Sequence, residues 1–394
     1  MKNGILNNLF HRAKNKIKNY VYYYFGYPYI INWKKDCGNL KRALFVYQVD
    51  PFYMEDNDEA FYFHNTQKQA IQIAEILTSK GFIIDIFDYR DKRIKLQCKY
   101  DLIISHNPNL IIHQSNLKHT TKIIYFAAGE NPIIANEKVR KCYLDFFKRN
   151  GTKLKIKRLA PEGDSFIKQS KYIVLYGNEN TAATFYKYYP KMMFCFNNYG
   201  YNNTRFEANH NNYEERKRNF LFFSGGDMVA KGLDLLLETF LNRDDVQLYI
   251  CAPYRNEKDF MRFYQRKINK RNNIHFCGFI RPLSEQYYNI VNKCGFIIHP
   301  SATEGQPGGV IQAMHSGLVP IISKYCGIDS GASMIVLKSC EIKEIDEIIN
   351  DCIKKGNDWL MEASLSNHKL AIKQYSEDAF NWNWNKILDT ILAT

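Results

Sequence analysis

The 394-residue sequence lacks several patterns that would place a protein in a class at once. It has no run of about 18 apolar residues, so we expect no transmembrane helix. Its N-terminus has no uninterrupted apolar segment with a small-residue cleavage site, so we expect no secretory signal peptide. The ten cysteines form neither a C-x-x-C pair nor a cluster with histidine. We therefore expect no metal site, and reduced thiols of a cytoplasmic protein.

The positive charge of the chain is concentrated near its N-terminus. Residues 1–42 carry nine Lys and Arg against one acid, Asp36, within a net charge of +14. Apolar residues from Leu6 to Tyr24 recur at helical spacing, and this basic amphipathic pattern has an aromatic edge. It predicts that residues 1–25 contact an anionic membrane surface, with packing on the protein's own core as the alternative. No nucleic-acid motif accompanies the charge, so we expect no nucleic-acid partner.

Apolar runs that predict strands alternate with helical patterns along the chain, which predicts an α/β fold of two Rossmann-like, doubly wound domains. After a basic extension over 1–40, we assign 41–200 to the first domain and 219–375 to the second. Residues 201–218, rich in Asn, Tyr and charge, form the predicted linker. A last helix covers 376–394.

The predicted strands are 42–49, 82–87, 101–105, 122–127, 171–176, 192–196, 219–223, 247–252, 273–278, 295–299, 318–322 and 334–337. The predicted helices are 65–80, 135–149, 181–189, 231–241, 258–270, 283–292 and 307–317, with a helical region after 337.

A glycine loop follows the predicted strand 219–223. It contains Ser224, Gly225 and Gly226, and Lys231 stands at the start of the next helix. Glycines let a backbone approach a phosphate closely, and a helix N-terminus supplies N–H donors. Lys231 lies where a cation would neutralise a diphosphate; the alternative is a solvated lysine. The loop matches neither a P-loop nor G-x-G-x-x-G.

A second glycine loop follows the predicted strand 295–299. Its carboxylate, Glu304, can accept hydrogen bonds from sugar hydroxyls, although it could equally partner its own loop. Gly308 and Gly309 open the next helix. Gln312 lies four residues after Gly308, hence on the same helix face, where an amide can pair with ribose hydroxyls or remain without a ligand.

These residues resemble a known family. The run 231–237, the tripeptide 299–301, and Glu304 with a polar residue eight positions later resemble the C-terminal half of glycosyltransferase family 4, the glycosyl transferases group 1. Residues 248–253, 273–278 and 376–382 resemble further stretches in the family's order. The resemblance implies a GT-B fold, with two domains facing a central cleft and a C-terminal helix that returns to the first domain. It also implies retaining transfer from a nucleotide-sugar donor without a cofactor or required metal.

Carried over to this sequence, the resemblance implies that Lys231 binds the donor diphosphate and Glu304 the donor sugar, and that Gln312 stands at the ribose position. The donor site so predicted comprises Ser224, Gly225, Gly226, Lys231, Pro253, Glu304, Gly308, Gly309 and Gln312. The predicted catalytic residues are Glu304 and Lys231, with Glu130, Asn131 and His106 as the candidates that face the reacting carbon.

The sequence departs from the family pattern at three places. Gln312 replaces an acid, Gly226 stands where the family has a phosphate-binding arginine, and Gln48–Pro51 replaces a glycine-rich acceptor loop. Two alternatives therefore stay open: a catalytically degenerate GT-B binding module at the membrane, and a nucleotide-sugar epimerase. We expect the acceptor to be a glycan or a lipid-linked glycan of cell-surface polysaccharide synthesis (capsule, O-antigen or lipopolysaccharide type). We expect the protein to act on the inner face of the membrane.

Overall fold

The computed structural model describes residues 26–34, 41–54, 65–91, 94–96, 98–208, 212–329, 331 and 333–394. The predicted membrane-contacting residues 1–25 lie outside this part. The described residues of Met1–Phe126, Gly163–Tyr172 and Ile391–Thr394 form one compact unit, here unit 1. Those of Ala127–Glu162 and Ile173–Thr390 form unit 2.

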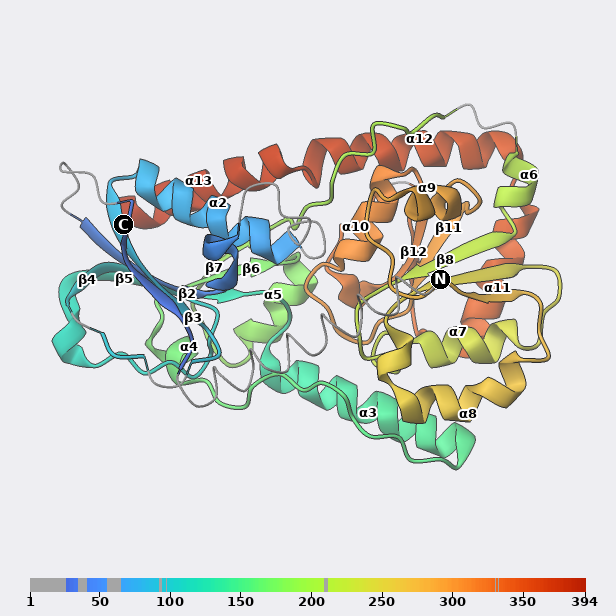
Figure 1. The fold of residues 1–394 in the computed structure, drawn as a ribbon, viewed down its shortest axis with the longest axis horizontal. Helices are drawn as coiled ribbons and strands as arrows, with labels where there is room; N and C mark the ends of the chain where they lie inside the picture. The colour runs from blue at the N-terminus through green and yellow to red at the C-terminus, as the bar shows by residue number, and fades with distance from the viewer. Residues whose placement is uncertain are drawn as a thin grey trace. The chain divides into compact units, whose positions relative to one another are not determined.

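Two sheets organise the fold. Their strand orders are β1-β3-β2-β4-β5-β6-β7 and β10-β9-β8-β11-β12-β13 (Figure 1). The pairings of β2 with β3 and β4, and of β8 with β9 and β11, are parallel, whereas β1 pairs with β3 in the antiparallel sense. Parallel neighbours need a crossover, which the intervening helices provide. The prediction of an α/β fold with two mostly parallel sheets is confirmed.

The bounds of the elements follow the predicted alternation. In the first part of the chain they are β1 (Tyr29–Trp33), β2 (Lys41–Tyr47), η1 (Asp50–Tyr53), α2 (Asn65–Ser79), β3 (Phe82–Asp88), β4 (Tyr100–Ser105), η3 (Gln114–Asn116), β5 (Leu117–Ala127), α3 (Pro132–Asn150), α4 (Ser165–Gln169), β6 (Tyr172–Tyr176), α5 (Glu179–Tyr186) and β7 (Met192–Phe196).

In the second part they are α6 (Tyr213–Arg216), β8 (Asn219–Phe223), α7 (Leu233–Phe240), β9 (Gln247–Cys251), η4 (Tyr254–Asn256), α8 (Lys258–Ile268), β10 (Ile274–Phe276), α9 (Glu285–Val291), β11 (Phe296–His299), α10 (Gly308–His315), β12 (Val319–Ser323), η5 (Lys324–Cys326), β13 (Ile335–Leu337), α11 (Ile342–Lys354), α12 (Asn357–Gln374) and α13 (Glu377–Ala393). The strand β1 and the short helices α4 and α6 were not predicted.

The second sheet is covered on both faces, because consecutive apolar residues of its strands, such as 220–223 of β8, are buried on either side. Phe220 and Phe222 of β8 pack into one core cluster with α7, α8 and α11, and Leu221 and Phe223 pack into the other with α9 and α10 (Figure 1). Successive side chains of a strand point to opposite faces, so an unbroken apolar run requires a helix layer on each side. Because helices cover both faces of this sheet, a polar site can form only at the ends of the strands and in the loops that follow them.

Unit 1 contains a buried carboxylate that several strands share. Asp85, on β3, is 1% exposed and accepts hydrogen bonds from the Arg42 guanidinium at 2.9 and 3.0 Å. The Tyr100 hydroxyl donates to the same carboxylate at 2.8 Å, and the backbone N–H of Asn32 donates at 2.9 Å. The partners come from β2, β4 and β1, so this carboxylate joins four strands.

We expect Asp85→Ala to destabilise the fold by about 3 kcal/mol, because the Arg42 guanidinium loses its carboxylate and the Tyr100 hydroxyl loses its acceptor. Urea unfolding followed by circular dichroism measures the change. The matched control is Glu75→Ala, since Glu75 pairs with Lys34 at side-chain exposures of 52% and 51% and should cost less than about 1 kcal/mol. Equal losses for the two variants would contradict this account of unit 1.

Candidate functional site

Two neighbouring strands bring the predicted residues Lys231 and Glu304 together. β8 and β11 are parallel partners, so their carboxyl ends lie at one edge of the second sheet. The loop after β8 leads to Lys231, and the loop after β11 contains Glu304. Lys231 Nζ lies 2.5 Å from Glu304 Oε1. Nε2 of His299, the last residue of β11, lies 3.0 Å from the same oxygen.

Glu304 remains ionised although it is mostly buried. Its side chain is 13% exposed, and those of Lys231 and His299 are 17% and 0% exposed. Burial by itself raises the pKa of Glu304, but the charge of Lys231 and the hydrogen bond and charge of His299 outweigh it and lower the pKa to about 2. At neutral pH this carboxylate is a hydrogen-bond acceptor only.

The loop after β8 is held by a second carboxylate beneath it. Asp227 has a φ of 71°. Glu257 accepts the backbone N–H groups of Asp227 at 2.6 Å and Met228 at 3.0 Å, and the Tyr143 hydroxyl donates to Asp227 Oδ1 at 2.8 Å. The N–H of Lys231 then donates to the carbonyl of Asp227 at 3.0 Å. Burial raises the pKa of Glu257 to about 7, although the two N–H groups act to lower it.

Two glycines allow the loops to approach closely. Gly232, with a φ of 77°, lies so near the loop after β11 that an added Cβ would be 2.5 Å from the carbonyl oxygen of Pro300. At Gly305, a Cβ would be 2.3 Å from the carbonyl oxygen of Ala128. Side chains at these positions would push the loops apart.

Glu130 joins the same group of side chains. The Thr303 hydroxyl donates to Glu130 Oε2 at 2.7 Å, and Lys138 Nζ lies 2.5 Å from Glu130 Oε1. Lys138 Nζ also lies 3.6 Å from the centre of the Tyr325 ring. Burial raises the pKa of Glu130, and the charge of Lys138 opposes that shift. The structure therefore places a second buried carboxylate beside the loop that carries Glu304.

Two of the predicted catalytic residues have structural partners. Asn131 is 1% exposed and caps α3, because its side-chain oxygen accepts the N–H of Ile133 at 2.9 Å. His106 belongs to unit 1, where its Nδ1 lies 2.9 Å from the carbonyl oxygen of Phe126. Their predicted catalytic roles stay predictions.

The predicted donor-binding glycines are exposed or half-buried, two in the loop after β8 and two at the start of α10. Gly225 and Gly226 are exposed, and Ser224 N–H donates to the carbonyl of Cys251 at 3.1 Å. Gly308 and Gly309 form the first residues of α10 and are half-buried. Pro253, also half-buried, follows β9 at the same edge of the sheet. These loops follow three adjacent parallel strands, as a ligand site of a doubly wound sheet does.

Gln312 has a partner that the sequence did not indicate. It is 2% exposed, its Oε1 accepts the N–H of Tyr201 at 2.8 Å, and its Nε2 donates to the carbonyl of Tyr201 at 2.9 Å. In this structure the amide fastens the start of the predicted linker to α10. Its predicted contact with ribose stays a prediction.

Sequence reasoning missed three residues of the site: His299, Thr303 and Glu257. His299 and Thr303 flank the motif that contains Glu304, and a polar residue that ends a buried strand was the available signal for His299. Glu257 has no such signal, because it reaches Asp227 across 30 residues of sequence. In the described part of the chain, no three His, Cys, Asp or Glu side chains are grouped as metal ligands would be.

The lowered pKa of Glu304 predicts an acid-sensitive contribution to stability. The folded protein keeps Glu304 ionised to about pH 2, whereas the unfolded chain protonates it near the ordinary value of 4.5. The contribution, about 3 kcal/mol, is therefore complete above pH 4.5 and is lost as the pH falls from 4.5 toward 2.

Urea unfolding of Glu304→Gln between pH 6 and pH 3 tests this expectation. The variant should be less stable than wild type at pH 6, and the difference should shrink as the pH falls. Glu347→Gln is the control, because Glu347 is 63% exposed and lies 3.9 Å from Lys343. A constant difference between Glu304→Gln and wild type would show that the carboxylate gains nothing from its partners.

Comparison with known proteins bears on the family and the fold. Residues 205–388 match the family model of the glycosyl transferases group 1, and no curated protein matches the sequence. Among solved structures, the fold is similar to Alr3699/HepE of Anabaena in complex with UDP and glucose, at 13% identity and a TM-score of 0.52, over 89% of this chain and 100% of that one.

It is also similar to sucrose-phosphate synthase of Thermosynechococcus elongatus, at 12% identity and a TM-score of 0.53, over 90% of this chain and 99% of that one. At these identities the likeness concerns the fold. The matched residues of the family model include the strands and loops that carry Lys231 and Glu304. Residues 205–388, somewhat less than half of the chain, thus match the glycosyl transferases group 1, and the protein is a glycosyltransferase with a GT-B fold.

Proposed function

We propose that this glycosyltransferase takes a sugar from a nucleotide-sugar donor bound at the loops after β8 and β11, and transfers it with retention of configuration. The observation that carries the proposal is the ionised Glu304 paired with Lys231 in front of α10. One cation, one acceptor-only carboxylate and the N–H groups of a helix start are the groups that a sugar diphosphate requires. Retention rests on the resemblance to glycosyltransferase family 4.

Lys231 acts on the leaving group in this proposal. When the bond between the anomeric carbon and the diphosphate breaks, negative charge grows on the phosphate oxygens. The Lys231 ammonium and the N–H groups of Gly308 and Gly309 stabilise that charge, and their fixed position avoids reorganisation during the reaction. The proposed mechanism uses no metal ion or other cofactor at the phosphates.

Glu304 orients the donor sugar. A carboxylate with a pKa of about 2 does not supply a proton at neutral pH, so it is not the general acid. It accepts hydrogen bonds from sugar hydroxyls and places the anomeric carbon. The acceptor hydroxyl then attacks from the side of the departing diphosphate and gives its proton to a phosphate oxygen, which yields the retained anomer. Glu130, beside the same loop, is the candidate that faces the reacting carbon.

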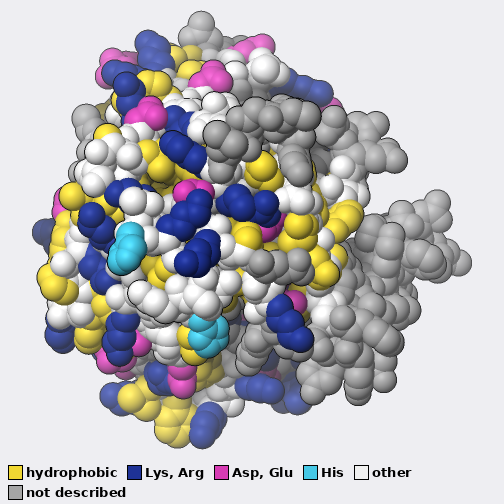
Figure 2. Space-filling model, turned by 90° about the vertical axis from the view of Figure 1, so that its left-hand side faces the viewer, with side chains coloured by type: hydrophobic (Ala, Val, Ile, Leu, Met, Phe, Trp, Pro, Cys, Tyr) yellow, Lys and Arg dark blue, Asp and Glu magenta, His cyan; other side chains and the backbone are white. Residues whose placement is uncertain are grey.

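We further propose a glycan or lipid-linked acceptor of cell-surface polysaccharide synthesis, reached from the inner face of an anionic membrane. The net charge of +14 supports attraction to such a surface. Figure 2 shows that Lys and Arg side chains are more prominent than Asp and Glu on one face of the molecule. In the described ranges, no helix combines the length and the hydropathy that crossing a bilayer requires.

The donor site is tested with Lys231→Ala. We expect the transfer rate to fall by a factor of about 10² or more, because the departing phosphates lose their cation. Transfer is first sought with UDP-sugars, since solved structures of the similar HepE contain UDP and UDP-glucose. Nuclear magnetic resonance of the product gives the anomer, and Lys343→Ala, at 86% side-chain exposure, is the matched control.

Melting experiments with UDP-, GDP- and CDP-sugars separate binding from turnover. A donor at about 100 times its Kd stabilises the protein by roughly 2.7 kcal/mol, which moves the melt visibly. If one donor raises the melting temperature of the wild type but not that of Lys231→Ala, the result supports the proposed donor site. Inverted product, or an unchanged rate in Lys231→Ala, contradicts the mechanism. No shift with any donor favours the degenerate binding module, and a rearranged free nucleotide sugar favours the epimerase.

A further inference from the structure

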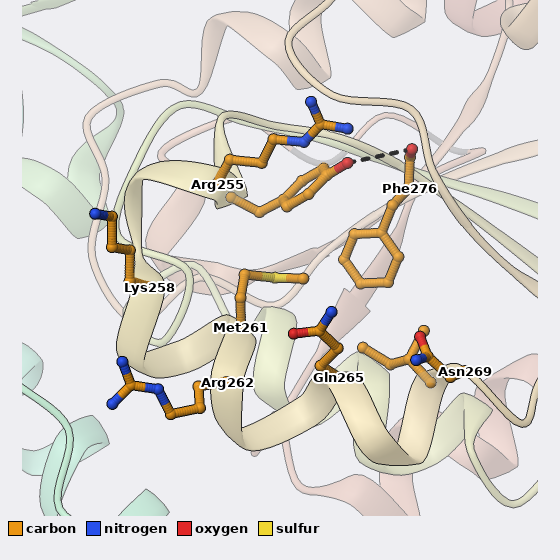
Figure 3. Close-up of a pocket in the computed structure, with 9 residues that line it drawn as sticks. Arg255, Lys258, Met261, Arg262, Gln265, Asn269 and Phe276 are labelled. Atoms are coloured by element: carbon orange, nitrogen blue, oxygen red, sulfur yellow. Dashed lines mark hydrogen bonds between the residues drawn. The ribbon is translucent and has the colours of Figure 1, made fainter.

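Unit 2 has a pocket that none of the predicted site residues lines. It lies along α8, next to η4 and the edge strand β10, and has a volume of about 480 Å³ (Figure 3). Its lining includes Arg255, Lys258, Arg262, Gln265 and Asn269, with Phe276 from β10. An edge strand has no further strand beside it, so the space next to β10 is open to a ligand.

One face of α8 carries the polar lining. Lys258, Arg262, Gln265 and Asn269 follow one another at intervals of four, three and four residues, which places them in one row along the helix. In Figure 3, the cations lie toward the start of α8 and the two amides toward its end. The pocket is therefore cationic at one end and able to donate and accept hydrogen bonds at the other.

The cationic end has no compensating carboxylate in the described part of the chain. Arg255, Lys258 and Arg262 are exposed, and no ion pair joins any of them to a described acid. The two acids next in sequence are engaged elsewhere: Asp259 lies 2.6 Å from Lys157, and Glu257 accepts backbone N–H groups of the loop after β8. Three unpaired cations around one concavity attract an anion.

The inner wall of the pocket is largely apolar and aromatic. Phe276 is half-buried, and its ring meets that of Tyr254 edge to face at 4.7 Å between centres. The Tyr254 hydroxyl donates to the carbonyl of Phe276 at 3.3 Å (Figure 3). Met261 completes this wall. Aromatic and thioether side chains of this kind pack against the C–H faces of sugar rings, as they do against other apolar surfaces.

We propose that this pocket binds an acidic saccharide, with its carboxylate or phosphate at Arg255, Lys258 and Arg262 and its hydroxyls at Gln265 and Asn269. The three parts of the pocket match an anionic group, hydroxyls and C–H faces carried on one extended molecule. The site goes beyond the proposed transfer reaction, because it shares no residue with the predicted donor site and its occupation needs no turnover.

Isothermal titration of the full chain with an oligogalacturonate hexamer at low salt tests the proposal. We expect measurable binding that weakens as salt screens the cations, and none of comparable strength with neutral maltohexaose. Lys258→Ala and Arg262→Ala should each weaken binding about tenfold, as loss of a charge-assisted hydrogen bond does. Gln265→Ala should weaken it less. The exposed positions leave the fold intact, which a melt confirms.

Arg266→Ala is the matched control, because it removes the same charge from an exposed position of α8 that does not line the pocket. It should leave the Kd within about twofold. An equal loss in Arg266→Ala would overturn the proposal by showing nonspecific attraction. If inorganic phosphate bound as tightly as the hexamer, the proposal of a saccharide ligand would be wrong. Binding to phosphatidylglycerol vesicles alone would also contradict it and would indicate that the pocket contacts a lipid surface. These titrations do not use the donor, so their failure leaves the proposed transfer untouched.

Discussion

The buried charge of Glu304 is the constraint on which the loops after β8 and β11 depend. Taking a carboxylate out of water costs several kcal/mol, and the cost is met only if cations and donors stay within hydrogen-bond distance. Lys231 at 2.5 Å and His299 at 3.0 Å meet it here, and the pKa near 2 shows that they more than offset the burial. A shift of the loop that carries Glu304 by an ångström would weaken both contacts at once, and a shift of the loop before Lys231 would weaken the contact with Lys231.

That requirement extends outward through the structure. The distance between Lys231 and Glu304 depends on the parallel pairing of β8 with β11 and on Gly232, which lets one loop touch the other. The backbone before Lys231 is set by Asp227, whose position Glu257 and Tyr143 fix from below. Tyr143 belongs to α3, so a helix far away in sequence supports the loop that carries Lys231. The candidate site thus consists of an ion pair between two loops and of a second layer of side chains that supports one of them.

The sequence predicted those elements whose signal lies within a short stretch of the chain. The strands β7 and β8 were predicted with their observed bounds, because each is an apolar run between polar residues. β1 was missed because its residues are half-buried or exposed, it pairs antiparallel at a sheet edge, and Asn32 has a φ of 57°. The helix α7 begins at Leu233, two residues after the predicted start, since Gly232 is left-handed.

The same rule separates the parts of the site. Lys231 and Glu304 were found from short motifs, in which each residue stands at a fixed place after a buried strand. The partners of Gln312 and Asp227 were not found, because Tyr201 lies 111 residues from Gln312 and Glu257 lies 30 residues from Asp227. The positions of Lys231 and Glu304 are set by the strands that precede them, and a sequence shows where a buried strand ends. The supporting residues are positioned by the packing of elements that are distant in the chain, and the sequence does not show that packing.

The ion pair also bears on how a donor would enter under the proposed function. Lys231 and Glu304 neutralise each other in this structure, where their side chains are 17% and 13% exposed. A diphosphate would form an ion pair with Lys231. Glu304 would then have a weaker interaction with that cation, although its carboxylate would still be buried. Sugar hydroxyls that donate hydrogen bonds to Glu304 would replace the stabilisation that the carboxylate loses. A nucleoside diphosphate alone supplies the anion without those sugar hydroxyls, whereas an intact nucleotide sugar supplies both. The buried pair therefore favours the whole donor over the product that remains after transfer.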